Sequence, residues 1–126
     1  FLAPNTIQSA ATIQTAGASA EGAVWTNEVA PDVNAPAYQA FLTAYKQRFG
    51  TDADIIAANA YDCVMLMAKA FSTTGTNATA ITKWLRSEKS YQGVSGTINF
   101  AKDGNVVNKP TSLFTIKDGK FVTISG

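Results

Sequence analysis

The stretch LFTIKDGKFVTI, residues 113–124, contains the clearest fold signal in this chain of 126 residues. Two runs of apolar and β-branched residues flank Asp118-Gly119, a dipeptide typical of the two-residue type I′ turn of a β-hairpin. If the residues next to the turn pair with each other, Ile116 lies opposite Phe121 and both side chains point to one face. The sequence therefore predicts a hairpin near the end of the chain.

A second pattern of period two precedes the hairpin. Between residues 94 and 100, apolar residues or glycine alternate with polar residues, which is typical of a half-buried strand. Asp103-Gly104 is expected to turn the chain after it. We therefore expect a strand beyond Tyr91.

The middle of the chain has helical periodicity. A first helix is expected from Pro36 to Gly50, with Tyr38, Phe41, Leu42, Tyr45 and Phe49 on one stripe. Asp52 or Asp54 is expected to cap a second helix, which is apolar around most of its circumference and is therefore predicted to be buried. Asn77 is expected to cap a third, shorter helix.

The first thirty residues suggest a helix followed by a strand. Asn5 or Thr6 can cap a short helix that ends near Gly17. Residues 23–26 then have the composition of a short strand.

Composition excludes several classes of function. Only 15% of the residues are charged, the net charge is +1, and the lysines are scattered, so no nucleic-acid partner is expected. The chain has no His, which removes the usual general base and most zinc sites. We therefore expect no enzyme activity, no cofactor and no metal. Polar residues interrupt the apolar stretch 55–71, which falls short of the about 20 apolar residues of a membrane span.

Several conspicuous residues have structural interpretations. Trp25 and Trp84 are expected in the core, and the lone Cys63 is expected to be a buried small hydrophobic residue. Residues 103–105 hint at a calcium loop, but further oxygen ligands at the required spacing are absent, which favours a turn. The sequon at residues 77–79 matters only in a eukaryotic secretory pathway.

Five segments carry a resemblance that covers nearly every residue: AGASAEGAVW (16–25), FLTAYKQRFG (41–50), ANAYDCVMLMAKAF (58–71), YQGVSGTINFAKDGN (91–105) and LFTIKDGKFVTI (113–124). In this order and spacing they resemble extracytoplasmic solute-binding proteins of the leucine/isoleucine/valine-binding type, the receptors of ABC importers. The chain looks like the final third of such a protein. Because it also begins at Phe1 without Met, we expect a fragment whose upstream part is a partner.

The resemblance implies an α/β fold that is part of a two-lobed clamp. Each lobe has a mostly parallel sheet with flanking helices, here with a C-terminal β-hairpin, and the ligand lies in the cleft between the lobes. By the same resemblance, residues 1–30 belong to the second lobe. Residues 31–90 form a helical segment that crosses the hinge to the first lobe, and residues 91–126 form the C-terminal strand and hairpin.

Three residues are candidates for ligand binding. Asn5 and Thr6 are expected in a strand-to-helix loop, where α/β sheets commonly bind ligands, with helix capping as their alternative role. Asp62 lies near the expected hinge, and it is either a ligand contact or a buried acid satisfied by hydrogen bonds. Relatives that bind amino acids often have an acidic residue for the α-ammonium group at the position of Asn5. An amide there leaves open a branched-chain amino acid, a related carboxylate or amide, or an aromatic ligand.

The resemblance implies a periplasmic or extracytoplasmic receptor that presents a small-molecule solute to the membrane permease of an ABC transporter. The alternative is the ligand-sensing domain of a signalling receptor with the same clamp. Strands removed from their sheet expose unpaired edges, so we expect the isolated piece to form a dimer or swapped oligomer. We also expect that piece to have negligible affinity for branched-chain amino acids.

Overall fold

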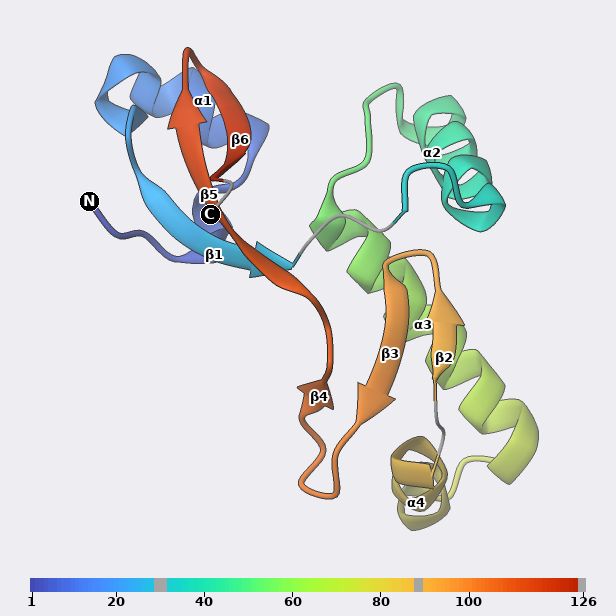
Figure 1. The fold of residues 1–126 in the computed structure, drawn as a ribbon. Helices are drawn as coiled ribbons and strands as arrows, with labels where there is room; N and C mark the ends of the chain where they lie inside the picture. The colour runs from blue at the N-terminus through green and yellow to red at the C-terminus, as the bar shows by residue number, and fades with distance from the viewer. Residues whose placement is uncertain (29–31, 88–89, 125–126) are drawn as a thin grey trace. The chain divides into compact units, whose positions relative to one another are not determined.

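A computed structural model describes residues 1–28, 32–87 and 90–124. The chain divides into two compact units, one formed by Phe1–Val29 with Pro110–Gly126 and the other by Ala30–Lys109 (Figure 1). Residues 91–126, expected as one C-terminal piece, therefore divide between the units. The expected boundary between residues 30 and 31 lies outside the described residues, and the assignment of ranges to lobes stays a prediction.

A three-stranded antiparallel sheet forms the base of the first unit. Its strand order is β1 (Val24–Glu28), β5 (Thr111–Lys117) and β6 (Lys120–Ile124). On the other side of β1, Leu2 forms a parallel bridge with Val24. The chain between Leu2 and Val24 forms a 3₁₀ helix, an α-helix and a second 3₁₀ helix, which are η1 (Asn5–Ile7), α1 (Ala10–Ala16) and η2 (Gly17–Ala20).

The resemblance implies a mostly parallel sheet. Among the described residues, the only parallel pairing is the bridge between Leu2 and Val24. The named strands pair in antiparallel fashion. A two-residue turn such as the one between β5 and β6 permits only antiparallel pairing, whereas parallel pairing needs a crossover such as the one through α1.

The predicted hairpin is confirmed. Asp118 and Gly119 have φ angles of 53° and 68°, as a type I′ turn requires. Ile116 pairs with Phe121, as expected. Both side chains contribute to the core of the first unit.

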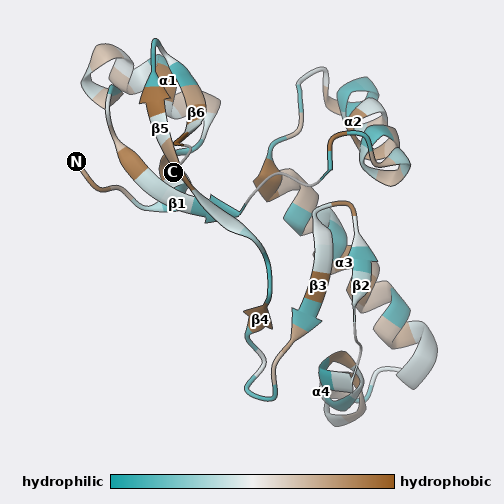
Figure 2. Ribbon diagram, viewed as in Figure 1, coloured by the Kyte–Doolittle hydropathy of each residue, from teal (hydrophilic) through white to brown (hydrophobic). Residues whose placement is uncertain are grey.

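Trp25 is the centre of that core, as expected. It is 2% exposed, lies 6.0 Å from the Phe114 ring in a stacked arrangement, and meets the Phe121 ring edge-on at 5.9 Å. Hydrophobic positions on β1 and β5 are brown in Figure 2. The remaining core residues of this unit are Ala20, Ala23 and Ile116, with Ile7 and Ile13 packed against them.

The predicted cap of the first helix is wrong. Ser9 caps α1, because its Oγ accepts a hydrogen bond from the Thr12 N–H at 3.2 Å. Asn5 and Thr6 instead lie in η1, a separate turn closed by a bond from the Gln8 N–H to the Asn5 carbonyl. The helix ends before Gly17, as predicted.

The second unit contains the three predicted helices, α2 (Pro36–Phe49), α3 (Ile55–Thr74) and α4 (Ala78–Ser87). Gly50 ends α2 in the left-handed conformation, which glycine adopts at low cost. Asp54 caps α3 by accepting the Ala57 N–H at 2.8 Å, and Asn77 accepts the Ala80 N–H at 2.9 Å. These predicted caps are confirmed.

The prediction that the second helix is buried is wrong for the described chain. Only one stripe of α3 is buried, formed by Ala58, Asp62, Leu66 and Ala70. Cys63 is exposed, against expectation, because the packing against α3 within this unit covers a single face. The helix is long and apolar enough to cross a membrane, a property that core helices of soluble proteins share.

The strand predicted from the alternation of residues 94–100 is confirmed for residues 96–100, but it belongs to a hairpin that was not predicted. The structure contains a hairpin of β2 (Tyr91–Gly93) and β3 (Gly96–Phe100), and β4 (Val106–Val107) pairs with β3. A turn at Val94–Ser95 interrupts the alternating pattern. The predicted turn at Asp103-Gly104 is confirmed by a hydrogen bond from the Gly104 N–H to the Ala101 carbonyl at 3.0 Å.

Candidate functional site

The first predicted ligand-binding segment follows the isolated parallel bridge between Leu2 and Val24. The Val24 N–H donates to the Phe1 carbonyl and the Ala3 N–H donates to the Val24 carbonyl, each at 2.9 Å. Asn5 and Thr6 lie in the turn just beyond this pairing. Ligands of open α/β sheets bind beyond the carboxyl ends of parallel strands, and this turn follows the bridging residue Leu2 in the chain.

The side chains of Asn5 and Thr6 are exposed. Within the part of the chain that the structure describes, neither side chain makes a hydrogen bond. The alternative role expected for them, capping of the following helix, belongs to Ser9. Their polar groups are therefore available for contact with a ligand.

Gln8 holds this turn against β1. Its Oε1 accepts hydrogen bonds from Trp25 Nε1 at 3.0 Å and from Asn27 Nδ2 at 2.7 Å. Trp25 and Asn27 are both buried, so their donors need this acceptor. Gln8 was not among the predicted site residues. The available signal was the spacing of Trp25 and Asn27, which places both on one face of the strand.

Asp62 lies in the second unit and is 1% exposed. Its Oδ1 accepts the Val94 N–H at 2.8 Å and its Oδ2 accepts the Ser95 N–H at 2.7 Å. This arrangement matches the second of its two expected roles, a buried acid satisfied by hydrogen bonds. A Cβ atom at Gly93 would overlap the Asp62 carboxylate, so glycine is needed where the hairpin approaches the helix.

The hydrogen bonds of Asp62 extend into a larger polar network. Lys109 Nζ donates to Ser95 Oγ at 3.1 Å and to Asn59 Oδ1 at 2.9 Å. Asn59 lies about one turn before Asp62 on α3. The network therefore joins α3, the β2–β3 turn and Lys109, which is the last residue of the second unit.

The structure thus brings Asn5 and Thr6 together in the first unit and places Asp62 in the second unit. Over residues 1–28, 32–87 and 90–124, no group of three or more His, Cys, Asp or Glu side chains is arranged to hold a metal ion. The candidate site therefore consists of Asn5 and Thr6, with Gln8 as their support.

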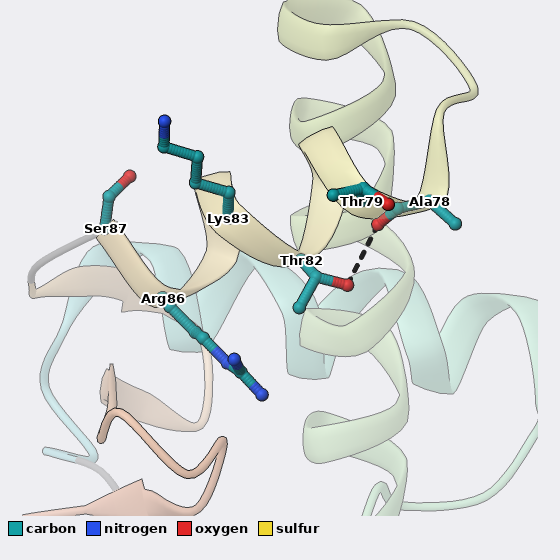
Figure 3. Close-up of a pocket in the computed structure, with 6 residues that line it drawn as sticks. All are labelled: Ala78, Thr79, Thr82, Lys83, Arg86 and Ser87. Carbon is teal, nitrogen blue, oxygen red and sulfur yellow. Dashed lines mark hydrogen bonds between the residues drawn. The ribbon is translucent and has the colours of Figure 1, made fainter.

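A shallow groove on the second unit does not add to this site. It runs along α4 and is lined by Ala78, Thr79, Thr82, Lys83, Arg86 and Ser87 (Figure 3). Lys83 and Arg86 point away from each other, and Thr82 Oγ1 donates to the Ala78 carbonyl of its own helix. Because every lining residue comes from one helix, no polar groups converge on a ligand.

Comparison with known proteins identifies the family. A family model described as periplasmic binding protein matches residues 2–120. No curated protein is significantly similar to the chain in sequence. The leucine-binding protein LivK of Thermotoga maritima has 24% identity and a TM-score of 0.82, and the match covers 98% of this chain and 36% of that one.

Two further solved structures match over 98% of this chain with 26% identity. One is the branched-chain amino acid transporter substrate-binding protein LivJ of Streptococcus pneumoniae in complex with isoleucine, with a TM-score of 0.79 and 36% of its own chain covered. The other is an ABC transporter substrate-binding protein of Desulfitobacterium hafniense in complex with leucine, with a TM-score of 0.77 and 35% covered.

The chain therefore spans little more than a third of the length of these solved proteins. The predicted resemblance and α/β fold class are confirmed, since a family model and several solved structures agree on them. The chain belongs to the periplasmic binding protein family.

Proposed function

We propose that this chain is part of an extracytoplasmic receptor of an ABC importer, which binds a small solute in a cleft between two lobes. Membership of the periplasmic binding protein family over residues 2–120 carries the proposal. The solute is a branched-chain amino acid or a related carboxylate or amide, as the leucine and isoleucine complexes of similar proteins suggest. The receptor presents this solute to the membrane permease of the importer.

Asn5 and Thr6 contact the solute in this proposal. Their side chains are exposed, take no part in capping α1, and closely follow Leu2, which forms a parallel bridge with Val24. An amide and a hydroxyl each offer both a donor and an acceptor. Asp62 supports the fold of the second unit, because both of its oxygens are occupied by backbone N–H groups.

The amide of Asn5 weakens selection for an α-ammonium group. An amide oxygen accepts a hydrogen bond from an ammonium group but supplies no opposite charge, and charge-assisted hydrogen bonds are about twice as strong as neutral ones. Solutes without an ammonium group are therefore competitors of leucine for this site.

The mechanism is closure without covalent chemistry. A solute that contacts both lobes only in the closed geometry binds that geometry more tightly and shifts the population toward it. The permease then distinguishes the closed receptor from the open one.

Calorimetric titration of the whole receptor tests this function. Leucine, isoleucine, valine and their deaminated carboxylates would be titrated into the wild type, Asn5→Ala and the matched control Asn34→Ala, an exposed asparagine of the second unit. We expect one of these solutes to bind the wild type, Asn5→Ala to weaken it about tenfold, a loss of about 1.4 kcal/mol, and Asn34→Ala to leave it unchanged. Absence of binding by every solute, or equal affinities for the wild type and Asn5→Ala, would contradict the proposal.

A further inference from the structure

The side-chain amide of Gln8 has an orientation that its neighbours determine. Trp25 Nε1 lies 3.0 Å and Asn27 Nδ2 lies 2.7 Å from Gln8 Oε1. An indole nitrogen donates a hydrogen bond and cannot accept one, so the Gln8 atom that faces Trp25 must be the amide oxygen. The amide nitrogen, Nε2, therefore occupies the other branch of the amide.

The amide of Asn27 is oriented in the same way. Its Oδ1 accepts the backbone N–H of Glu28 at 2.9 Å, and a backbone N–H is only a donor. The Asn27 atom that faces Gln8 is thus the amide nitrogen. Because Trp25 and Asn27 are both buried, a reversed Gln8 amide would leave two buried donors facing an N–H₂ group, which is unfavourable.

The N–H groups of Gln8 Nε2 are accessible. Within residues 1–28, 32–87 and 90–124, Nε2 donates no hydrogen bond. Every fully buried side-chain nitrogen or oxygen of these residues that lies on a buried or half-buried residue has a partner, and Gln8 is half-buried, so solvent must reach Nε2. The structure therefore holds this donor in one orientation and leaves its hydrogens available to another molecule.

Gln8 belongs to the same turn as the two proposed solute contacts. Its backbone N–H donates to the Asn5 carbonyl at 3.1 Å and closes η1. Residues three apart in a 3₁₀ turn lie on the same side of it, so Gln8 follows Asn5 along one side of η1. A solute that contacts Asn5 is therefore the molecule best placed to accept a hydrogen bond from Gln8 Nε2.

We propose that Gln8 Nε2 donates a hydrogen bond to an oxygen atom of the solute, so that Gln8 helps to determine specificity. This inference rests on the proposed function, because it takes Asn5 and Thr6 as solute contacts. An ammonium group has three donors and no acceptor, so it cannot accept a hydrogen bond from Nε2, whereas a carbonyl oxygen can. Gln8 therefore favours a 2-oxo acid over the corresponding amino acid.

Gln8→Glu separates this role from support of the turn. The variant keeps an oxygen for Trp25 and Asn27 but replaces the Nε2 donor with a second, negatively charged acceptor. Calorimetry of the whole receptor would measure its affinities for leucine, isoleucine, valine and the corresponding 2-oxo acids. The members of each pair differ in having an ammonium group or a carbonyl oxygen on the same carbon. We expect Gln8→Glu to lower the affinity for the 2-oxo acid, relative to that for the amino acid, about tenfold.

The matched control is Gln14→Glu, because Gln14 is exposed on α1 of the same unit and gains the same charge. Measurement at about 0.5 M salt screens charges that are not in contact with the solute. The ratio of affinities should not change in this control. The urea midpoint of Gln8→Glu should stay at the wild-type value, since the acceptor for the two buried donors is retained, whereas Gln8→Leu should lower the midpoint.

Four results would overturn the inference. An unchanged ratio in Gln8→Glu, or equal weakening of both members of a pair, would restrict Gln8 to support of the turn and leave the proposed function intact. The same change of ratio in Gln14→Glu would assign the effect to charge at a distance. Binding of amino acids alone by the wild type would exclude selection for an oxygen. If the wild type bound none of the six solutes, the proposed function would fail, and this inference with it.

Discussion

Two turns in this molecule have the same hydrogen-bond arrangement in opposite environments. Asp62 accepts the two backbone N–H groups of the Val94–Ser95 turn, at 2.8 and 2.7 Å. Glu21 accepts the two backbone N–H groups of the Asp118–Gly119 turn, at 3.0 and 2.6 Å. Asp62 is 1% exposed, whereas Glu21 is exposed to solvent.

The comparison shows that geometry alone does not determine how much a turn depends on its carboxylate. Water can replace Glu21 at an exposed turn, and Asp118-Gly119 itself favours the required backbone conformation. Water cannot readily replace Asp62, and Val94-Ser95 lacks the Asn-Gly or Asp-Gly signal that favours a two-residue hairpin turn. We infer that the buried turn depends on Asp62 and that the exposed turn depends mainly on its own sequence.

The largest expected effect comes from removing the buried carboxylate. Asp62→Ala leaves two buried N–H groups without an acceptor, so we expect it to lower the free energy of unfolding by about 3 to 5 kcal/mol. Glu21→Ala should cost at most about 1 kcal/mol, because water replaces the lost bonds. Urea unfolding measures both values.

The two tryptophans separate the responses of the two units, because Trp25 lies in the first and Trp84 in the second. Fluorescence of Asp62→Ala in a Trp25→Phe background reports the second unit alone. Equal losses for Asp62→Ala and Glu21→Ala would contradict the importance of burial.

The next effect is the coupling between each turn and its carboxylate. Gly93→Ala brings a Cβ into the Asp62 carboxylate, and overpacking of this kind costs about 1 to 3 kcal/mol. In the double variant with Asp62→Ala much of that cost should disappear, giving a coupling energy of at least about 1 kcal/mol. Gly119→Ala is disfavoured by its φ of +68° but meets no atom within 4 Å. The effects of Gly119→Ala and Glu21→Ala on stability should therefore be additive. If the effects of Gly93→Ala and Asp62→Ala were additive as well, the predicted contact between a Cβ at residue 93 and the Asp62 carboxylate would be disproved.

A smaller effect is expected from the outer part of the buried network. Lys109→Met removes the hydrogen bonds to Asn59 and Ser95, and we expect a loss of about 1 kcal/mol because Lys109 is only half-buried. Lys117→Met, at the exposed turn, is the matched control and should change stability by less than about 0.5 kcal/mol. A larger loss of unfolding free energy for Lys117→Met than for Lys109→Met would contradict the prediction that the buried network matters more for stability than the exposed turn.

The contrast between a turn that depends on its own sequence and a turn that depends on a distant carboxylate also explains which elements could be predicted. The β5–β6 hairpin and its register follow from Asp118-Gly119, a local signal. The helix at Pro36–Phe49 follows from its apolar stripe and from Gly50. Each of these elements is determined by residues that are neighbours in sequence, so periodicity and turn chemistry suffice.

The errors arose where distant residues decide the structure. The β2–β3 turn depends on Asp62, which is 32 residues from Val94, so the alternation of residues 94–100 by itself predicts one continuous strand. Ser9 replaced Asn5 and Thr6 as a cap because a 3₁₀ turn intervenes. At the candidate site, the location of Asn5 and Thr6 before the first α-helix was predictable. The support from Gln8 was not, because it crosses from a turn to β1.

A third turn extends the comparison to a carboxylate with local partners. Asp103 accepts hydrogen bonds from the backbone N–H and the side-chain amide of Asn105, at 3.0 and 2.9 Å. These bonds, the backbone bond first, hold the pKa of Asp103 below its usual value of 3.8. Since the pKa is lower in the folded state, the carboxylate stabilises the fold above about pH 4. This contribution is lost as the pH falls through the lowered pKa.

The expected effect at this fully exposed turn is the smallest of the series. The difference in unfolding free energy between the wild type and Asp103→Asn should be constant from pH 7 down to about pH 4 and should shrink at lower pH. A difference that grows as the pH falls below about 4 would contradict this direction of the shift.

The most direct test of the proposed receptor function is a charge change at Asn5. Leucine and 4-methylpentanoate differ only in the ammonium group, so calorimetry of the whole receptor with both solutes isolates the contribution of that group. If Asn5 faces the solute, Asn5→Asp should raise the affinity for leucine relative to 4-methylpentanoate about tenfold, which corresponds to about 1.4 kcal/mol. An unchanged ratio of the two affinities would contradict the placement of Asn5 at the binding site.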